Sequence, residues 1–260
     1  MKGIILAAGD GGRLRPLTFD TPKSLLKVGG IPLIDYPLAA LRSAGVSDIA
    51  VVVGYQADRM CDELSDLHPD LSFIYNEDYD EGNAISLYTA REFVQDDAFF
   101  LCMADHPISP DIPMRLISGP LESCMLCVDG RASHSSQIGD ATRVLADDGI
   151  ILEIGKQLRT WNAVDTGVFN MTPDVFPVIE RLMLRQQMDV GISDIVTYMA
   201  ANGQPFMACD VSGMFWADVD TAEDYESVNN LLTGAAWTAY MTESSPATSI
   251  GGFPGPQHAF

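Results

Sequence analysis

A glycine-rich loop near the start of the chain holds the first residues that suggest chemistry. In the stretch "LAAGDGGRLRPLTFDTPKSLL", Gly9, Gly11 and Gly12 follow an apolar run, and two cations, Arg13 and Lys23, come after them. Because glycine has no side chain, backbone N–H groups in such a loop can face phosphate oxygens, while nearby cations neutralise the phosphate charge. The stretch therefore predicts a phosphate-binding loop.

Two common phosphate loops have a different pattern. A P-loop requires Gly-Lys-Ser/Thr directly after its glycines, whereas Arg13 and Leu14 follow here. A dinucleotide fingerprint requires G-x-G-x-x-G at the opening of a helix, and Pro16 interrupts any such helix. The remaining alternative is a solvated turn with surface cations. It is disfavoured because the chain has only four lysines, at positions 2, 23, 27 and 156.

Carboxylates that follow apolar runs are the second chemical feature. Asp105 ends the run "AFFLCMAD", and Asp218 and Asp220 follow "GMFW". Phosphoryl and nucleotidyl transfer need positioning, charge neutralisation and a metal ion, and Mg²⁺ prefers carboxylate oxygens. The alternative is that these aspartates look like a metal-binding pair by chance, since the chain has 26 aspartates. His106, beside Asp105, either contacts the substrate or metal or is structural.

Strand and helix patterns alternate in the first half of the chain, which predicts a parallel sheet with right-handed crossovers. Apolar strands are expected over 2–9, 48–55, 71–76 and 98–105, with helices over 32–45, 57–67 and 83–94. In the second half we expect strands over 122–129, 142–156, 163–172 and 205–221, and helices over 174–187, 191–203 and 222–234.

The expected fold class is α/β, with a Rossmann-like, mostly parallel twisted sheet and a small mixed lobe that binds the acceptor. A turn at 147–149 is expected to join two strands of that lobe. One domain is expected over 1–233, and residues 234–260, rich in Ser, Thr, Gly and Pro, are expected to form a loose tail.

Composition narrows the class of protein. The 260 residues carry a formal net charge of -21, which disfavours nucleic acid and anionic membranes as partners. No apolar run approaches the ~20 residues of a membrane span, and the amino terminus lacks the core of a signal peptide. The five cysteines do not suggest a zinc site or a disulfide framework. We expect a cytoplasmic protein without membrane insertion; its oligomeric state stays open, a homodimer included.

The glycine-rich stretch resembles the signature of nucleotidyltransferases that join a nucleoside triphosphate to a sugar phosphate or a similar phosphate. That signature runs L-A-A-G-x-G-[ST]-R-L and then P-K-[PSA]-[LM]. The matching residues are Leu6, Ala7, Ala8, Gly9, Gly11, Arg13, Leu14, Pro22 and Lys23. Gly12 departs from it, since relatives have Thr or Ser there, so one hydroxyl contact to phosphate is missing.

The resemblance implies a role for each part of the site. It implies the nucleotide-diphospho-sugar transferase type of fold, with the triphosphate on the loop from Leu6 to Arg13, Gly12 included. Asp105 and Asp218 would hold Mg²⁺, with Asp220 as an alternate or helper ligand. Lys23 and Arg13 would be the catalytic cations. The nucleotide base would be bound by Asn76, Gly82, Asn83 and Ser86; a helix N-cap is the alternative role of Asn83.

A narrower resemblance covers about residues 1–230. The motifs "EGNAISLY", "MADH", "QIGDATRV", "IGKQL", "NAVDTGVF" and "WADVDT" occur in the order seen in CTP:inositol-1-phosphate cytidylyltransferases. It implies that CTP and inositol 1-phosphate give CDP-inositol and pyrophosphate. In that family the domain is often fused to a membrane-embedded phosphotransferase, and no such hydrophobic segment is seen in this sequence.

The acceptor side of the site is expected from the second half of the chain. Lys156 and Arg143 are the cations expected to hold the acceptor phosphate, and Asp165 and Thr166 are expected to contact its hydroxyl groups. Three alternatives stay open. They are a hexose 1-phosphate with UTP or dTTP as the nucleotide, phosphocholine with CTP, and a nucleotide-sensing subunit without catalysis.

Overall fold

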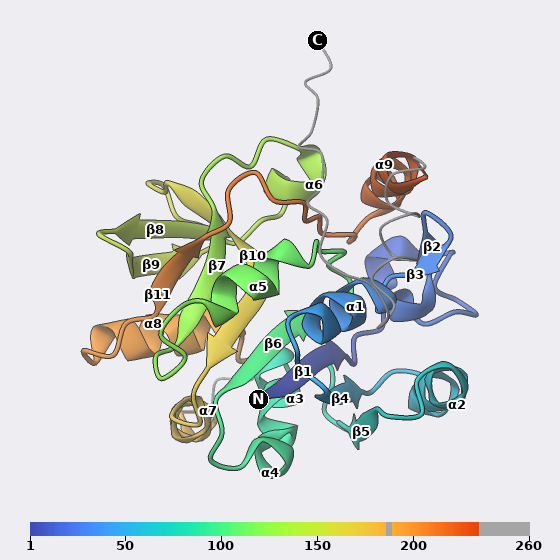
Figure 1. Cartoon of the computed structure of the whole chain (residues 1–260), viewed down its shortest axis with the longest axis horizontal. Coiled ribbons are helices and arrows are strands. Elements are labelled where there is room, and N and C mark those ends of the chain that lie inside the picture. The colour runs from blue at the N-terminus through green and yellow to red at the C-terminus, as the bar shows by residue number, and fades with distance from the viewer. Residues whose placement is uncertain (186–188, 234–260) are drawn as a thin grey trace.

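One mixed sheet runs through the part of the chain that the computed structural model describes, residues 1–185 and 189–233. The strand order is β5-β4-β1-β6-β10-β7-β11-β9-β8. The first four positions hold parallel strands in the doubly wound order (Figure 1). These strands are β1 (Lys2–Ala7), β4 (Asp48–Val53), β5 (Ser72–Tyr75) and β6 (Phe99–Met103).

The second half of the chain extends the same sheet. Strand β10 (Ala163–Met171) lies antiparallel between β6 and β7, and β11 lies parallel to β7. The hairpin β8–β9 closes the far edge, and its turn has left-handed residues at Asp148 and Gly149. The remaining strands are β7 (Met125–Asp129), β8 (Arg143–Asp147), β9 (Ile150–Gly155) and β11 (Met207–Asp210).

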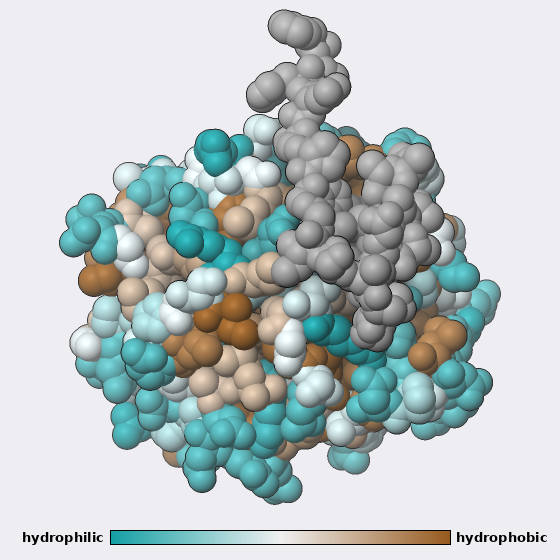
Figure 2. Space-filling model, viewed as in Figure 1, coloured by the Kyte–Doolittle hydropathy of each residue, from teal (hydrophilic) through white to brown (hydrophobic). Residues whose placement is uncertain are grey.

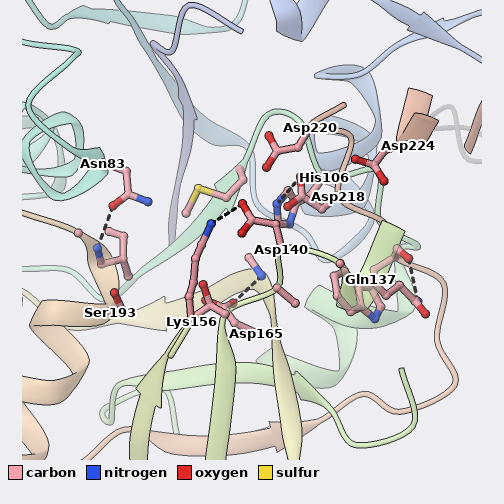
Figure 3. A pocket seen from close by; sticks show the side chains of 18 of the residues that line it. Asn83, His106, Gln137, Asp140, Lys156, Asp165, Ser193, Asp218, Asp220 and Asp224 are labelled. Carbon is pink, nitrogen blue, oxygen red and sulfur yellow. Dashed lines mark hydrogen bonds and ion pairs between the residues drawn. The ribbon is translucent and has the colours of Figure 1, made fainter. Parts of the chain in front are cut away.

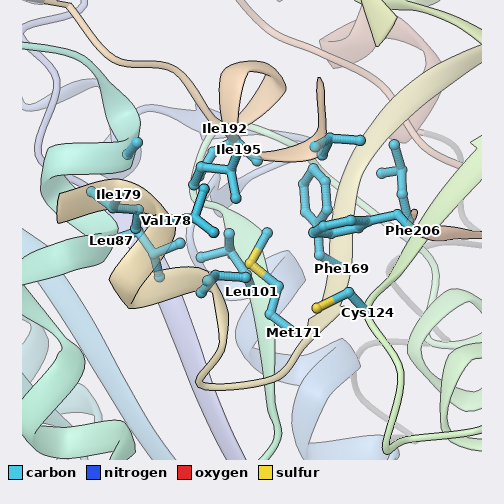
Figure 4. Packing of buried hydrophobic residues seen from close by; sticks show 14 of the residues in the cluster. Leu87, Leu101, Cys124, Phe169, Met171, Val178, Ile179, Ile192, Ile195 and Phe206 are labelled. Carbon is cyan, nitrogen blue, oxygen red and sulfur yellow. The ribbon is translucent and has the colours of Figure 1, made fainter. Parts of the chain in front are cut away.

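The parallel strands are apolar on both sides because helices cover both faces of the sheet. Ile4 and Leu6 of β1 pack into one core cluster, while Ile5 and Ala7 pack into the other. The first cluster lies under α3 (Asn83–Thr89), α4 (Arg91–Val94), α7 (Val175–Leu184) and α8 (Ile192–Ala201) (Figure 4). The second lies under α1 (Asp35–Ser43), α2 (Ala57–Leu67) and α5 (Asp111–Ile117).

A third, smaller core cluster holds the glycine-rich segment against the carboxyl-terminal helix. Leu14 and Leu26 pack with Val219 and with Val228 and Leu232 of the last helix. The cluster therefore brings residues near 14 and 219 together, although they are distant in the sequence. Its elements are 3₁₀ turns at Gly12–Leu14 and Lys23–Leu25, β2 (Lys27–Val28), β3 (Ile31–Pro32), and α9 (Ala222–Leu232), near which α6 (Ser135–Ile138) lies.

The predicted α/β fold class is confirmed, and four details differ. The sheet is mixed and not mostly parallel, because four of its eight neighbouring strand pairs are antiparallel. The helix expected over 83–94 is interrupted at Ala90, giving α3 and α4. The strand expected over 205–221 is regular only in β11, after which the chain makes a single bridge between Ile108 and Trp216. Helices α5 and α6 were not expected. The tail expected over 234–260 lies outside the described residues.

Polar and apolar residues occupy different parts of the surface. Hydrophilic residues gather around the rim of the face seen in Figure 2, and apolar residues appear nearer its centre. Within the described residues, no helix is both long and apolar enough to cross a membrane.

Candidate active site

Two cavities lie where the parallel strands end. The smaller, of about 310 Å³, is lined by the glycine loop (residues 9–13), Lys23, Asp105 and Asp220, and is called the loop cavity below. The other, of about 460 Å³, is called the larger cavity; its lining includes His106, Lys156, Asp165 and Asp218 (Figure 3). Asp220 lines both cavities, so they adjoin. Such an edge of an open α/β sheet is where ligands usually bind.

Backbone pairing brings Asp105 and Asp218 together. The segment 215–219 runs alongside 105–109 through hydrogen bonds from Ala217 N to Pro107 O (3.1 Å) and from Val219 N to Asp105 O (3.3 Å). Trp216 anchors the segment, because its indole N–H donates to the buried Asp129 at 3.0 Å. Asp218 thus reaches the end of β6 through non-local contacts.

Asp105, His106 and Asp218 form a cluster with the donor atoms of a metal site. One ligand atom from each lies within 4.8 Å of the other two. Asp218 Oδ1 is buried and accepts no hydrogen bond from the described residues; its nearest ion-pair partner is His106 Nε2, at 3.5 Å. Buried polar atoms normally have partners, so a carboxylate oxygen left in this way fits a divalent cation.

His106 is held in place from the opposite side. Its Nδ1 donates to the Thr166 carbonyl at 2.9 Å, since a carbonyl can only accept, and this leaves Nε2 facing the two aspartates. Gly167, at φ +76°, makes room for the ring, because a Cβ there would lie 2.3 Å from Nδ1. Burial lowers the pKa of His106, but the charges of Asp218 and Asp105 outweigh burial and raise it to about 10.

Lys23 lies between two carboxylates at the floor of the loop cavity. Its ammonium donates to Asp105 Oδ2 and, at 2.6 Å, to Asp220 Oδ1, and its side chain is 11% exposed. Burial opposes the charge, but Asp105 and Asp220 hold the pKa of Lys23 above its ordinary value. Burial likewise opposes ionisation of Asp105, but the Lys23 charge lowers the pKa of that carboxyl to about 2. Both groups are therefore charged at neutral pH.

Both carboxylate oxygens of Asp220 accept hydrogen bonds from cationic side chains. Its Oδ1 accepts from Lys23, and its Oδ2 accepts from Arg13 Nη2 at 2.5 Å. Asp220 is not in the metal-like cluster. The structure therefore places it as the partner of the two cations, beside the pair Asp105 and Asp218.

Gly11 requires glycine for the shape of the loop. It adopts the left-handed conformation, φ +61°, and its carbonyl accepts the Thr18 hydroxyl at 2.9 Å. A Cβ at Gly11 would lie 2.9 Å from both Lys23 Cβ and Thr18 Cγ2. At Gly12, the backbone N–H donates to Asp10 Oδ1 at 3.1 Å, so a carboxylate faces this N–H in the structure.

We expect Gly11→Ala to lower catalytic efficiency at least about tenfold and to destabilise the fold by about 1–2 kcal/mol. The stability cost is that of an alanine in the left-handed region, and the activity cost comes from the displaced Lys23. Gly30→Ala is the matched control, because Gly30 has φ +84° but nothing within 4 Å of the added Cβ. Thermal melts and steady-state kinetics of both variants check this. Equal activity in the two variants would contradict the role of the close approach.

Of the four residues predicted to bind the base, Asn83 lines the larger cavity, and the other three line neither cavity. Asn76 and Ser86 are buried and hydrogen-bonded to each other, Nδ2 to Oγ at 3.0 Å. Gly82 packs against Val190, whose carbonyl a Cβ would meet at 2.4 Å. Asn83 lines the larger cavity, and its Oδ1 accepts the Ile192 N–H at 2.8 Å (Figure 3). Asn83 thus fastens the start of α8, an arrangement its sequence position did not predict.

Of the four residues predicted to bind the acceptor, two line the larger cavity and two do not. Lys156 and Asp165 line the larger cavity, and burial raises the pKa of Asp165 to about 6. Thr166 lies beneath the cavity, with its hydroxyl on the Cys127 carbonyl and its own carbonyl on His106. Arg143 lies outside the lining; it donates to the Leu158 carbonyl at 2.9 Å and covers the Trp161 ring.

Several residues that line the larger cavity were not predicted from the sequence. Gln137 donates to the Trp216 carbonyl at 3.1 Å, which fixes one wall of the larger cavity. Thr221 and Asp224 form the capping box at the start of α9, and Ser193 belongs to the first turn of α8. The capping pattern Thr-x-x-Asp was a visible signal for α9; nothing local indicated the approach of α8.

A Rossmann-like sheet with a glycine loop, a buried lysine and paired aspartates at its carboxyl edge defines a nucleotide-binding α/β protein of the phosphate-transfer type. The chain belongs to the MobA-like NTP transferase domain family, which matches residues 3–149. This confirms the predicted membership among the nucleotidyltransferases.

Three relatives are informative. The chain is 32% identical over 234 residues to the "bifunctional IPC transferase and DIPP synthase" of Aquifex aeolicus, covering 90% of this chain and 52% of the relative. It is 40% identical over 156 residues to the 2-aminoethylphosphonate cytidylyltransferase of Lancefieldella rimae, covering 60% of this chain and 61% of the relative. A solved inositol-1-phosphate CTP transferase from T. maritima has a TM-score of 0.80 at 28% identity, covering 90% and 96% of the two chains. The chain spans about half the length of the bifunctional relatives it matches.

Proposed function

We propose that the chain is a Mg²⁺-dependent cytidylyltransferase that joins CTP to inositol 1-phosphate or a close polyol phosphate. The observation that carries the proposal is the cluster of Asp105, His106 and Asp218 at the junction of the loop cavity and the larger cavity. A divalent ion is typical of the nucleotidyltransferases, and this junction is where a triphosphate and an acceptor would meet.

In the proposed reaction, an oxygen of the acceptor phosphate forms a bond to the α-phosphorus of CTP. The bond from that phosphorus to the β-phosphate oxygen breaks, and pyrophosphate leaves with the electron pair. No general base is required, because a phosphate monoester is largely dianionic at neutral pH. Mg²⁺, when bound by Asp105 and Asp218, would neutralise charge at the α-phosphate.

The residues of the chain supply the rest of the reaction. Backbone N–H groups of the glycine loop bind triphosphate oxygens. Lys23 and Arg13 neutralise negative charge that develops as pyrophosphate departs. Lys156, from the opposite wall, binds the acceptor phosphate, and Asp165 accepts hydrogen bonds from its hydroxyl groups. Because Arg143 lies outside the cavity lining, Lys156 is the cation of the acceptor side in this proposal.

The lining of the larger cavity favours a polyol over phosphocholine. A quaternary ammonium group is held by exposed aromatic faces. Phe169 and Trp216, the aromatic residues among the described lining residues, are 1% and 2% exposed. The carboxylates of Asp165, Glu223 and Asp224 instead suit the many hydroxyl donors of a polyol ring.

Pyrophosphate release with a panel of substrates tests the proposal. CTP, UTP and dTTP are each combined with inositol 1-phosphate, glucose 1-phosphate, phosphocholine and 2-aminoethylphosphonate in the presence of Mg²⁺. With CTP, inositol 1-phosphate should exceed phosphocholine and 2-aminoethylphosphonate by about 100-fold or more in kcat/KM, because a site built for hydroxyl groups rejects acceptors that lack them. A preference for phosphocholine or 2-aminoethylphosphonate contradicts the polyol assignment. CTP binding without pyrophosphate release on any acceptor would instead indicate a nucleotide sensor.

We expect Lys156→Met to lower kcat/KM for the acceptor by about 10- to 100-fold, with a smaller change in the KM for CTP. The reason is the loss of a charge-assisted hydrogen bond to the acceptor phosphate. Lys27→Met, which removes an exposed lysine on β2, is the control. Initial rates with each substrate varied in turn check this. An equal loss of efficiency for both substrates would place Lys156 elsewhere in the reaction.

A further inference from the structure

A single oxygen atom connects the two sides of the site. Asp140 Oδ2 accepts from Arg13 Nη1 at 2.7 Å and from Lys156 Nζ at 2.7 Å. Arg13 belongs to the glycine loop, whereas Lys156 follows β9, and Asp140 belongs to the loop between α6 and β8. Figure 3 shows the Lys156 side chain extended toward Asp140 across the larger cavity.

The Asp140 carboxylate forms ion pairs with two cations that the proposed reaction needs for binding phosphate. Arg13 serves the triphosphate and Lys156 serves the acceptor phosphate, and both face the same counter-ion when no substrate is present. The side chains of Arg13, Asp140 and Lys156 are 56%, 52% and 50% exposed. Ion pairs so open to water are weak, so phosphate groups can compete with Asp140 for either cation. The two cations lower the pKa of Asp140, which therefore stays ionised.

We propose that Asp140 is a positioning residue that couples the binding of the two substrates. The inference rests on the proposed function. The coupling depends on the movement of one atom. A phosphate that pushes Asp140 Oδ2 away from Arg13 also moves this oxygen away from Lys156, which lies 2.7 Å from it, and the reverse is true. The first substrate supplies the free energy that opens this ion-pair clasp (Arg13, Asp140 and Lys156), and the second then binds to a free cation. Each substrate therefore strengthens the binding of the other.

Binding of α,β-methylene-CTP with Mg²⁺, measured by calorimetry with and without inositol 1-phosphate, tests the clasp. This analogue cannot transfer CMP, so binding is separated from turnover. For the unaltered protein, the acceptor should tighten analogue binding about threefold to tenfold. In Asp140→Asn and Asp140→Ala, the analogue alone should bind tighter by a similar factor, and the acceptor should add little.

The matched control is Asp148→Asn. It removes the same charge from the β8–β9 hairpin, but at the turn, whereas Asp140 and Lys156 flank the opposite end of the hairpin. Asparagine suits the left-handed conformation of Asp148 (φ 47°). A general charge effect would appear in the control too. Salt adds a second readout: the difference between Asp140→Asn and the unaltered protein should shrink toward 1 M salt, where exposed pairs are screened.

The outcomes separate the two proposals. If the Asp140 variants bind the analogue with unchanged affinity and unchanged coupling to the acceptor, the clasp is wrong while the proposed function stands. If the Asp140 variants bind both ligands more weakly, Asp140 holds substrates directly and the clasp is again wrong. If the analogue binds none of the proteins, the proposed function fails, and the clasp fails with it.

Discussion

Asp105→Asn should lower kcat for CMP transfer by about three orders of magnitude while the fold remains intact. Asp105 contributes one of the two carboxylates of the proposed metal site, and an amide oxygen is a far weaker ligand for a divalent cation. The loss of charge neutralisation at the reacting phosphate accounts for a reduction of this size. Lys23 keeps Asp220 as its partner, so the change leaves no unpaired buried ammonium.

Metal binding gives this prediction a readout besides activity. Titration with Mn²⁺, followed by electron paramagnetic resonance, should show a site in the unaltered protein and at least tenfold weaker binding in Asp105→Asn. Asp97→Asn is the matched control, because Asp97 precedes β6 and Asp105 follows it. Asp97 should therefore be dispensable for both activity and Mn²⁺ binding. Near-normal turnover by Asp105→Asn would refute the metal assignment.

Residues whose positions depend on local structure were predictable from the sequence. Asp105 follows an apolar run that forms β6, and a residue after a buried parallel strand lies at the ligand-binding edge of the sheet. Gly11 follows β1 in the same manner. For both residues, the strand pattern and the chemistry of the residue type point to the same place.

Residues whose positions depend on non-local packing were harder to predict. Asp218 reaches Asp105 because its segment pairs with 105–109, a contact that no periodicity encodes; the family resemblance implied that pairing, and the residues alone did not. Arg143 was expected in the acceptor site on the basis of charge, but in β8 it reaches the Leu158 carbonyl instead. The double pairing of Asp140 likewise requires the glycine loop, which is distant in the sequence, to meet the end of the β8–β9 hairpin.

The electrostatics of the site explain how a chain with so few cations can bind phosphate groups. The chain has 15 lysines and arginines against 36 acidic residues. Three of its cations, Lys23, Arg13 and Lys156, form one continuous network with Asp105, Asp220 and Asp140. Each acidic partner holds a cation at the position where the proposed reaction needs one for phosphate. The carboxylates thus keep the cations in place until phosphate oxygens replace them.

Lys23→Met should have the opposite effect on metal binding from Asp105→Asn, although it also lowers kcat by about three orders of magnitude. The Lys23 ammonium donates a hydrogen bond to the Asp105 carboxylate from the side of the glycine loop. It therefore competes with any divalent ion for that carboxylate. Without Lys23, activity falls because developing charge on the phosphates is no longer neutralised. Mn²⁺ should nevertheless bind several-fold tighter, because its competitor has gone.

The same variant should make stability depend on the metal. Removal of Lys23 leaves Asp105 and Asp220 close together without their shared ammonium, which should destabilise the fold by about 2 kcal/mol in EDTA, since both carboxylates keep some contact with water. Added Mg²⁺ should restore much of the lost Tm by binding the folded state. Lys27→Met, the surface control, should show neither effect. A Lys23→Met variant with unchanged Mn²⁺ affinity and a Tm indifferent to Mg²⁺ would show that the lysine and the metal do not share Asp105.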